Sequence, residues 1–455
     1  MKNLLDWSVY KDAGIGDAYA DTPRSGGNFA KAVAVCINSM QCEQSSKGVM
    51  CPSYRVSKLH VLSTGGRVRL LKAALNGGLG EQPFQDRNLT HAMELCVGCK
   101  GCKRECENEV DMAMIKVEYL AQHYLHSHIP LRTRVLSNLS FLLQYYACFK
   151  TLVKWRNRSS LLKKLTQWTL GLSEKRHLPE PVKMTYTKLH ETEQETTPVT
   201  TDVPATEVVL LIDTFTDNFS PQTAKDAIAV LSAAGYKVHV TQPGNNTPDP
   251  LRPLCCGRTH IANGLIEQAK VEATRMLSVL LPHVEAGRTI IGLEPACLLA
   301  IRDDYKFLGM GQAASKVADH AILFEEFVAR EVAAKRFELE LKPVDTHQQP
   351  LMIHGHCHQK AVGAMKSMRK VLKLIPELDF KIIDSSCCGM AGSFGIEQEH
   401  AEMAMQMAEL SLLPALREHN TSRIVANGFS CQHQIKEGVN RSAVHVATIL
   451  REALA

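Results

Sequence analysis

Residues 96–106 have the sequence CVGCKGCKREC, which places four cysteines at the spacing C-x2-C-x2-C-x3-C. The first three thiolates of such a stretch can bind three irons of one cubane cluster, and the fourth normally binds a different cluster. Gly98 and Gly101 allow the close backbone approach that the turn requires, and their amides can donate hydrogen bonds to cluster sulfurs. A zinc site is the alternative, but zinc sites usually combine two separate C-x2-C pairs. The stretch therefore predicts an iron–sulfur cluster.

An upstream cysteine is expected to complete this site. Cys51 is followed by Pro52. In proteins with two clusters, the Cys-Pro of one motif supplies the last ligand of the other motif's cluster. We therefore expect one [4Fe–4S] cluster near the N-terminus. Its predicted ligands are Cys51, Cys96, Cys99 and Cys102.

Three cysteines of the same region remain, namely Cys36, Cys42 and Cys106. They predict a second cluster, although Cys106 is followed by Glu107 and not by proline. The five-residue gap between Cys36 and Cys42 resembles the [3Fe–4S] motif of succinate dehydrogenase iron–sulfur subunits, in which one iron corner lacks a cysteine. A [3Fe–4S] cluster, a [4Fe–4S] cluster with a non-cysteine ligand, and buried thiols without metal are the three alternatives.

The composition is that of an ordinary globular protein. The chain has 455 residues, which suggests about three domains, and it is 45% hydrophobic and 22% charged. A net charge of +5 does not by itself indicate a nucleic-acid partner. Fifteen cysteines in tight groups, without a predicted secretory signal, favour a reducing, cytoplasmic compartment and metal-bound thiolates. No run of about 18 apolar residues occurs, so no membrane-spanning helix is expected.

Residues 1–130 are expected to form an α-helical, ferredoxin-like domain, with helices over 66–75 and 112–126 where apolar residues recur at helical spacing. Residues 131–173 contain eight Lys or Arg and no Asp or Glu, interleaved with apolar and aromatic residues. Such basic amphipathic segments are typical of helices on an anionic membrane surface, which here would be the inner face of the cytoplasmic membrane. We expect instead that the apolar face packs on the cluster domain or a partner subunit, and that Cys148 is a core thiol.

Residues 174–206 contain many threonines and few large apolar residues, which predicts a flexible linker. Beyond the linker, apolar runs alternate with helical patterns. This alternation predicts α/β units with a parallel sheet. Strands are predicted over 207–213, 237–241 and 351–354, and a helix over 224–234.

A Cys-Cys-Gly turn occurs twice in this half, at residues 255–257 and 387–389, and a further cysteine follows each turn, Cys297 or Cys431. From Cys255 to Cys387 is 132 residues, and from Cys297 to Cys431 is 134. Matching offsets predict a duplicated module, with each cysteine site where a strand gives way to a loop. The predicted modules span residues 207–340 and 341–455.

Each Cys-Cys-Gly turn offers two thiolates from one loop, which suits iron–sulfur clusters or zinc. The second module has a fourth cysteine, Cys357, flanked by His354, His356 and His358, and His433 follows nearby. These histidines are candidate ligands or proton carriers, and His356 is the one that we select as a ligand. The predicted metal ligands of the two modules are Cys255, Cys256, Cys297, Cys357, Cys387, Cys388, Cys431 and His356.

Taken together, these motifs resemble a known family. A two-motif cluster domain followed by Cys-Cys-Gly (CCG) modules is similar to the iron–sulfur subunits of glycolate oxidase and anaerobic glycerol-3-phosphate dehydrogenase, and to the cysteine-rich domain of heterodisulfide reductases. The chain resembles more closely the C-terminal half of FAD-linked D-2-hydroxyacid dehydrogenases, including bacterial D-2-hydroxyglutarate dehydrogenases. The stretches responsible are VMCPSYRVS (49–57), CVGCKGCKRECENEVDMA (96–113), CCGR (255–258), GLEPAC (292–297), HGHCHQKA (354–361), CCGMAGSFG (387–395) and NGFSCQHQI (427–435).

The chain departs from this family at three places. Glu107 replaces a usual proline, and Ala300 and Gln434 stand where heterodisulfide reductases have a fifth cysteine. The resemblance implies an α+β multidomain electron-transfer subunit. It would pass electrons from a partner flavoprotein, which holds the FAD and oxidises a D-2-hydroxyacid, to a quinone or another acceptor. Thiol–disulfide catalysis at Cys387-Cys388 and zinc-stabilised structural modules are the alternatives.

Overall fold

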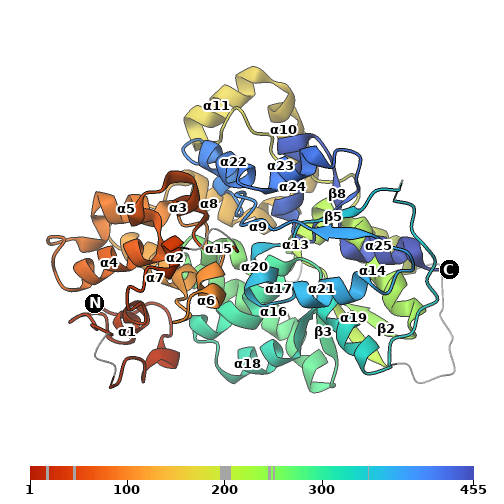
Figure 1. Ribbon diagram of the computed structural model, residues 1–455, viewed down its shortest axis with the longest axis horizontal. Helices are drawn as coiled ribbons and strands as arrows, with labels where there is room; N and C mark the ends of the chain where they lie inside the picture. Colours follow the sequence, from red (N-terminus) through yellow and green to blue (C-terminus); the bar gives the residue numbers. More distant parts are fainter. Residues whose placement is uncertain (17–19, 45–47, 195–205, 244–246, 250–251, 347) are drawn as a thin grey trace.

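The computed structural model describes residues 1–455 except 17–19, 45–47, 195–205, 244–246, 250–251 and 347 (Figure 1). Its N-terminal part is helical, and the predicted helices over 66–75 and 112–126 are confirmed within a few residues. The helices are α1 (Gly27–Ala34), α2 (Gln41–Gln44), α3 (Pro52–Ser57), α4 (Thr64–Leu75), α5 (Arg87–Glu94), α6 (Gly101–Glu105) and α7 (Met112–His123). Short 3-10 turns lie at η1 (Ser8–Tyr10), η2 (His60–Leu62) and η3 (Pro83–Gln85).

Side-chain caps define where the longer helices of this part begin. The Ser63 hydroxyl accepts a hydrogen bond from the Gly66 amide at the start of α4, and an Asp111 carboxylate oxygen accepts one from the Met114 amide at the start of α7. The buried Glu118 carboxylate on α7 accepts hydrogen bonds from the N-terminal segment, including the Trp7 indole at 3.0 Å. These contacts fix the N-terminus against the helices that surround the first four-cysteine stretch.

The segment predicted as basic and amphipathic forms α8 (Leu131–Ser137), α9 (Leu139–Gln144), α10 (Tyr146–Arg158) and α11 (Ser160–Leu170). The expectation that Cys148 is a core thiol is wrong, because Cys148 is exposed on α10. The predicted linker is partly helical, since α12 (Tyr186–Gln194) lies within it. Its remaining residues 195–205 lie outside the described part of the chain.

The C-terminal half contains two four-stranded parallel sheets. The strand orders are β2-β1-β3-β4 and β6-β5-β7-β8, so both sheets have the same topology. The predicted strands coincide with β1, β2 and β5 to within two residues. In β1, residues 208–211 are buried on both faces, as expected for a covered parallel sheet. The strands are β1 (Glu207–Leu211), β2 (Lys237–Val240), β3 (Thr289–Gly292), β4 (Ala321–Leu323), β5 (Leu351–Ile353), β6 (Phe380–Ile382), β7 (Ile424–Val425) and β8 (Ala443–Val444).

Helices cover the faces of both sheets. Those of the first sheet are α13 (Thr214–Phe219), α14 (Pro221–Ala233), α15 (Arg258–Ala262), α16 (Ile266–Glu285), α17 (Pro295–Asp303), α18 (Gly311–His320) and α19 (Phe324–Ala333), with the turn η4 (Asp304–Leu308). Those of the second sheet are α20 (Cys357–Ala361), α21 (Met365–Leu372), α22 (Ala401–Glu409), α23 (Leu412–Glu418), α24 (Phe429–Val439) and α25 (Val446–Ala453), with η5 (Phe394–Ile396).

The parts of the chain share their cores. One apolar core joins the N-terminal helices to the first sheet, and another joins the two sheets, with α14 packed on α25 and α19 on α21. The second sheet region also reaches the N-terminal helices, because α20 contacts α6 and α22 contacts α3 (Figure 1). None of the described helices is both long and apolar enough to cross a bilayer.

Candidate functional site

The four predicted ligands of the first cluster line one pocket. Cys96 follows α5, Cys99 precedes α6, Cys102 lies on α6, and Cys51 immediately precedes α3. All four side chains are buried and border the same pocket, together with Thr64, Arg67 and the backbone of Gly98. The structure thus brings together Cys51 and a stretch that begins 45 residues later, as the spacing predicted.

The backbone around this pocket has the tight turns that a cluster site needs. Cys51 and Lys100 have φ of 53° and 58°, and Gly98 has φ of 59°. A side chain at Gly101 would place its Cβ 2.9 Å from the Met50 amide nitrogen, so glycine is required there. The Thr64 amide donates a 3.1 Å hydrogen bond to the Cys51 sulfur, the kind of contact that stabilises a cluster thiolate.

Burial governs the chemistry of these thiols. It raises the pKa of Cys102 to about 12, with further contributions from Asp111 and Cys96, and it raises the pKa of Cys99 in the same direction. Such thiols stay protonated in the metal-free chain, whereas a coordinating metal removes the proton from a thiol outright. The buried Arg67 guanidinium offers a permanent positive charge at the pocket wall. The residues present therefore fit a buried anionic cluster.

A buried ion network anchors the cluster loop to the first sheet region. The Lys100 ammonium and the Arg258 guanidinium both pair with the Asp304 carboxylate, the latter at 2.9 Å. Asp304 is 1% exposed, and the two cations hold its pKa below the usual value against the effect of burial. The network fixes the backbone between Cys99 and Cys102.

The second predicted group consists of Cys36, Cys42 and Cys106, and Cys42 contacts Cys51. Cys106 and Cys42 are close enough to Cys36 to raise its pKa, although burial is the larger cause. The Cys42 and Cys51 thiols share a hydrogen bond, and the Gly65 amide donates to the Cys42 sulfur at 3.4 Å. The three thiols therefore gather next to the first pocket.

The cysteines of the second sheet region also meet at one place. Thiol hydrogen bonds connect Cys357 to Cys387, Cys387 to Cys388, and Cys388 to Cys431. The ligand atoms of Cys388, Cys431 and His354 all lie within 4.8 Å of one another. His354 is fully enclosed; its Nδ1 contacts the Ser385 hydroxyl at 2.9 Å, and its Nε2 has no hydrogen-bond partner. A buried, unpartnered imidazole nitrogen beside two thiols fits a soft metal.

The other histidines have different roles. The His356 Nδ1 accepts a 3.2 Å hydrogen bond from the His358 amide and caps α20, while burial, with Arg258 and Lys360, lowers the pKa of His356 to about 3. The His358 Nε2 donates to the Gly98 carbonyl at 3.0 Å, and the His433 Nε2 donates to the His177 carbonyl. Sequence reasoning noted His354 but selected His356. The end of β5 was the available signal, because His354 directly follows that strand.

The second sheet region adjoins the first cluster pocket directly. Cys99, Cys357, Cys387 and Val49 form one buried apolar contact group. Across the same boundary, the Ser386 hydroxyl donates a 2.8 Å hydrogen bond to the Val49 carbonyl. The two cysteine sites are thus separated by side chains in contact, without an intervening layer of solvent.

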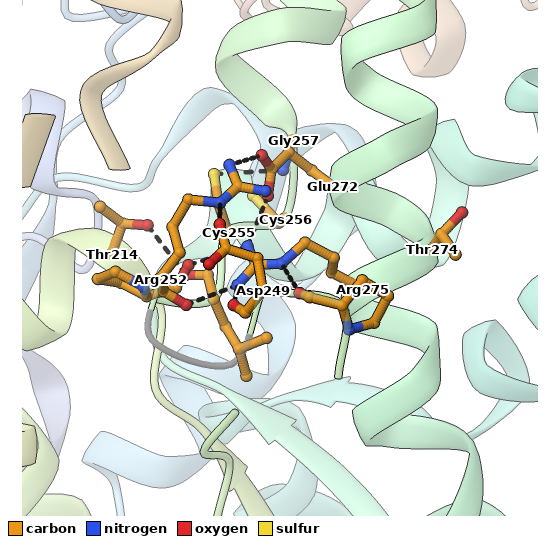
Figure 2. A network of polar contacts seen from close by, with 12 residues as sticks. Thr214, Asp249, Arg252, Cys255, Cys256, Gly257, Glu272, Thr274 and Arg275 are labelled. Atoms are coloured by element: carbon orange, nitrogen blue, oxygen red, sulfur yellow. Dashed lines mark hydrogen bonds and ion pairs between the residues drawn. The ribbon is translucent and has the colours of Figure 1, made fainter. Parts of the chain in front are cut away.

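The corresponding site in the first sheet region is held in a different way. Cys255, Cys256 and Cys297 are linked by thiol hydrogen bonds, and all are buried. Figure 2 shows that Arg252, Glu272 and Arg275 surround this loop. The buried Glu272 carboxylate pairs with both guanidinium groups, at 3.1 Å from that of Arg275. Arg275 also donates to the carbonyl oxygens of Pro248, Asp249, Arg252 and Pro253.

The first sheet region also lacks two of the second region's candidate ligands. Asp213 caps α13 as His356 caps α20, so Thr214 stands where the second region has Cys357. By the same alignment, Leu211 corresponds to His354. Among the described residues, no three metal-ligating atoms within 4.8 Å of one another include Cys255, Cys256 or Cys297, and the same holds for the N-terminal cysteines.

The chain is similar to several known proteins. A family model described as "CCG: Cysteine-rich domain" matches residues 351–436. The chain is 21% identical over 453 residues to D-2-hydroxyglutarate dehydrogenase of Haemophilus influenzae, covering 89% of this chain and 42% of that protein. It is 29% identical over 238 residues to a subunit of the anaerobic glycerol-3-phosphate dehydrogenase of Escherichia coli, covering 52% of this chain and 56% of that relative. It is 25% identical over 445 residues to the probable glycolate oxidase iron-sulfur subunit of Bacillus subtilis, covering 89% of this chain and 91% of that protein.

The chain spans about half the length of the first two of these relatives. No solved structure matches it. The family model covers the part that contains His354, Cys387, Cys388 and Cys431, and the dehydrogenase and iron–sulfur subunit matches extend the similarity over most of the chain. Residues 351–436 therefore match the CCG cysteine-rich domain, and most of the chain is similar to a probable glycolate oxidase iron-sulfur subunit and to part of D-2-hydroxyglutarate dehydrogenase.

Proposed function

We propose that the chain is an iron–sulfur electron-transfer subunit. It accepts electrons from a separate FAD-containing dehydrogenase that oxidises a D-2-hydroxyacid, and it delivers them to a quinone or another acceptor. The observation that supports this most directly is the single buried pocket lined by Cys51, Cys96, Cys99 and Cys102. A [4Fe–4S] cluster there would supply one-electron transfer, and the flavin chemistry would belong to the partner.

The residues around the pocket would set the properties of the cluster. Thr64 offers hydrogen bonds to the Cys51 sulfur, and hydrogen bonds to cluster sulfurs affect the reduction potential. Arg67 is held in place because its Nε donates to the Ala92 carbonyl at 2.7 Å and its guanidinium also donates to the Ser53 hydroxyl. A fixed buried cation favours the more negative, reduced form of a cluster. The chain would thus take up electrons more readily than it would without Arg67.

A second cluster on Cys36, Cys42 and Cys106 would lie next to the first. The shared hydrogen bond between Cys42 and Cys51 supports a short distance for electron transfer between the two proposed clusters. The Glu105 carboxylate holds the loop before Cys51, since it accepts hydrogen bonds from the amides of Val49 and Met50 at 2.7 and 2.9 Å. With three thiolates, either a [3Fe–4S] cluster or a [4Fe–4S] cluster with a non-cysteine ligand fits.

For the C-terminal half we propose two modules, over residues 207–340 and 341–455, that arose by duplication and that follow a ferredoxin-like domain over residues 1–130. Their common strand order supports this division. Only the second module would hold a metal or cluster, with His354, Cys388 and Cys431 as ligands and Cys357 and Cys387 adjoining. The first module would be structural, because ion pairs and hydrogen bonds hold its Cys-Cys-Gly loop. The near-complete burial of Cys387 and Cys388, at 2% and 3% exposed, argues against thiol–disulfide catalysis on an external substrate.

Metal analysis of the anaerobically purified chain tests this proposal. We expect at least about four irons and four sulfides per chain, with an EPR signal that appears on reduction. Replacement of Cys99 by serine should abolish that signal, whereas Cys148→Ser, at an exposed position, should leave it unchanged. A signal already present in the oxidised chain would identify [3Fe–4S] on the second group. Zinc without iron, or a Cys99→Ser variant that keeps the full signal, would contradict the electron-transfer function.

A further inference from the structure

The helices α9, α10 and α11 expose an unusual amount of apolar surface. Trp168 and Leu161 are 85% and 78% exposed, respectively. In Figure 1, α10 and α11 form the upper edge of the molecule, beyond α22 and α23. No residue of α11 is buried. Large side chains exposed together on these helices are Phe141, Tyr145, Leu152, Trp155, Leu161, Leu165 and Trp168.

These side chains recur at the spacing of helix faces. On α10 and the residue before it, Tyr145, Leu152 and Trp155 are separated by seven and three residues, and the exposed Cys148 fills the gap between the first two. On α11, Leu161, Leu165 and Trp168 are separated by four and three residues. Residues three or four apart lie on one side of a helix. Each helix therefore has an apolar stripe that faces outward.

Helix α10 is fixed to the body of the protein by residues adjacent to its apolar stripe. The buried Arg156 on α10 donates hydrogen bonds to the carbonyl oxygens of Ser173 and Arg176. The Asn157 side chain donates to the Leu178 carbonyl at 2.8 Å. Val153 is also buried. These contacts define the orientation of α10, so the outward direction of its apolar stripe is a consequence of the fold.

The charge of the segment that forms α8 to α11 indicates which kind of partner suits this surface. Residues 131–173 contain eight Lys or Arg and no Asp or Glu, so the segment has a formal charge of +8. Arg156 is used internally, and Arg132 pairs with Glu397 and Glu399. Arg134, Arg158 and Lys164 are exposed, and Lys164 lies three residues after Leu161 and four before Trp168, on the apolar side of α11.

We propose that this surface, formed by the exposed side chains of residues 141–168, binds an anionic lipid bilayer at the level of its headgroups. Protein–protein interfaces are depleted in lysine at their centres, whereas lysine beside tryptophan is typical of helices that lie in the membrane interface. Apolar side chains would enter the acyl boundary while the cations remain among anionic headgroups. The proposal adds a location to the proposed function without depending on the cluster ligands, and it would place the chain beside a membrane-dissolved acceptor.

Vesicle co-sedimentation of the intact, cluster-loaded chain tests the proposal. We expect binding to vesicles of phosphatidylcholine with phosphatidylglycerol, weaker binding to phosphatidylcholine alone, and weaker binding as salt is raised. The double variant Trp155→Glu/Trp168→Glu should bind roughly tenfold less tightly or worse, because it removes apolar area and adds negative charge. Val271→Glu changes an exposed apolar residue on α16 and should bind like the wild type.

Three results would overturn the proposal. The first is no binding of the wild type to anionic vesicles at low salt. The second is equal vesicle binding by the wild type and the double variant, when both have the same iron content and thermal midpoint. The third is a concentration-dependent dimer, measured by light scattering, that the double variant abolishes while vesicle binding persists, because the surface would then join two copies. Iron content and the EPR signal of the same preparations report separately on the electron-transfer function.

Discussion

Burial disfavours the ionised form of the Glu294 carboxyl group in the folded protein. Glu294 is 6% exposed at the start of α17, and its two oxygens accept hydrogen bonds from the Ala296 amide at 3.1 Å and from the Phe429 amide of the second sheet region at 2.7 Å. Burial, with a further contribution from Asp213, raises the pKa of Glu294 from its ordinary value of 4.5 to about 8. The carboxyl group is therefore protonated at neutral pH in the folded chain and ionised in the unfolded chain.

This difference makes the stability of the fold depend on pH. Because the folded-state pKa is the higher one, the contribution of Glu294 is fully present below pH 4.5 and is lost as pH rises to about 8. The loss over this window is on the order of 5 kcal/mol, at about 1.4 kcal/mol for each unit of pKa. Ionisation of Glu294 should therefore lower the free energy of unfolding of the wild type as pH rises from 5 to 9.

The variant Glu294→Gln removes the ionisation and keeps an oxygen for one of the two amide donors. Its thermal midpoint, followed by circular dichroism from pH 5 to 9, should fall less steeply than that of the wild type, so that the two curves differ in slope by several degrees over the range. Glu267→Gln, on the exposed surface of α16, should give a curve parallel to the wild type. Parallel curves for wild type and Glu294→Gln would refute the reasoning, since they would mean that Glu294 ionises alike in both states.

Three further perturbations test the sites. His354→Ala should lower the metal content of the second sheet region, measured by metal analysis, and should leave the EPR signal of the first cluster; His356→Ala should keep the metal and only weaken the start of α20. Asp304→Asn removes the closest partner of the buried Lys100 and the partner of the partly buried Arg258, and should cost about 3 kcal/mol in denaturant unfolding, whereas Asp319→Asn, at an exposed position on α18, should have little effect. Arg67→Gln should make the reduction potential of the first cluster more negative in a redox titration monitored by EPR, and an unchanged potential would exclude a tuning role.

The sequence predicted that Cys51 lies beside the cysteines of residues 96–102, because a local spacing rule relates them. Three thiols of one turn and a Cys-Pro are constrained by short spacings, so Cys51 and the stretch at 96–106 could be paired without the fold. The choice between His354 and His356 had no such rule. His354 directly follows β5 and His356 directly precedes α20, so which one faces the thiols depends on where the strand stops and the helix begins.

The error at Cys148 has a similar origin. A stripe of apolar residues three and four apart indicates that one side of a helix is distinct, but it does not indicate what covers that side. Core helices and surface helices have the same period, so the prediction of a core thiol followed the commoner case. The exposure of the stripe emerges only from the structure, in which the Arg156 hydrogen bonds fix how α10 is turned. The short helix α12 was missed because its residues lack an apolar period.

Cys357 and Cys387 pack against Cys99 at the edge of the first cluster pocket. This contact has a consequence for the assembly of the cluster. Synthesis proceeds from the N-terminus, so the proposed ligands of the first cluster leave the ribosome more than 250 residues before Cys357 and Cys387 do. Throughout this interval the pocket would lack Cys357 and Cys387 on one side, and a cluster donor could reach the thiolates from there. Arrival of the last quarter of the chain then closes that side with packed side chains. The order of translation itself thus provides a loading stage followed by a sealing stage, and a cluster lost from the finished protein could be replaced only by opening the contact again.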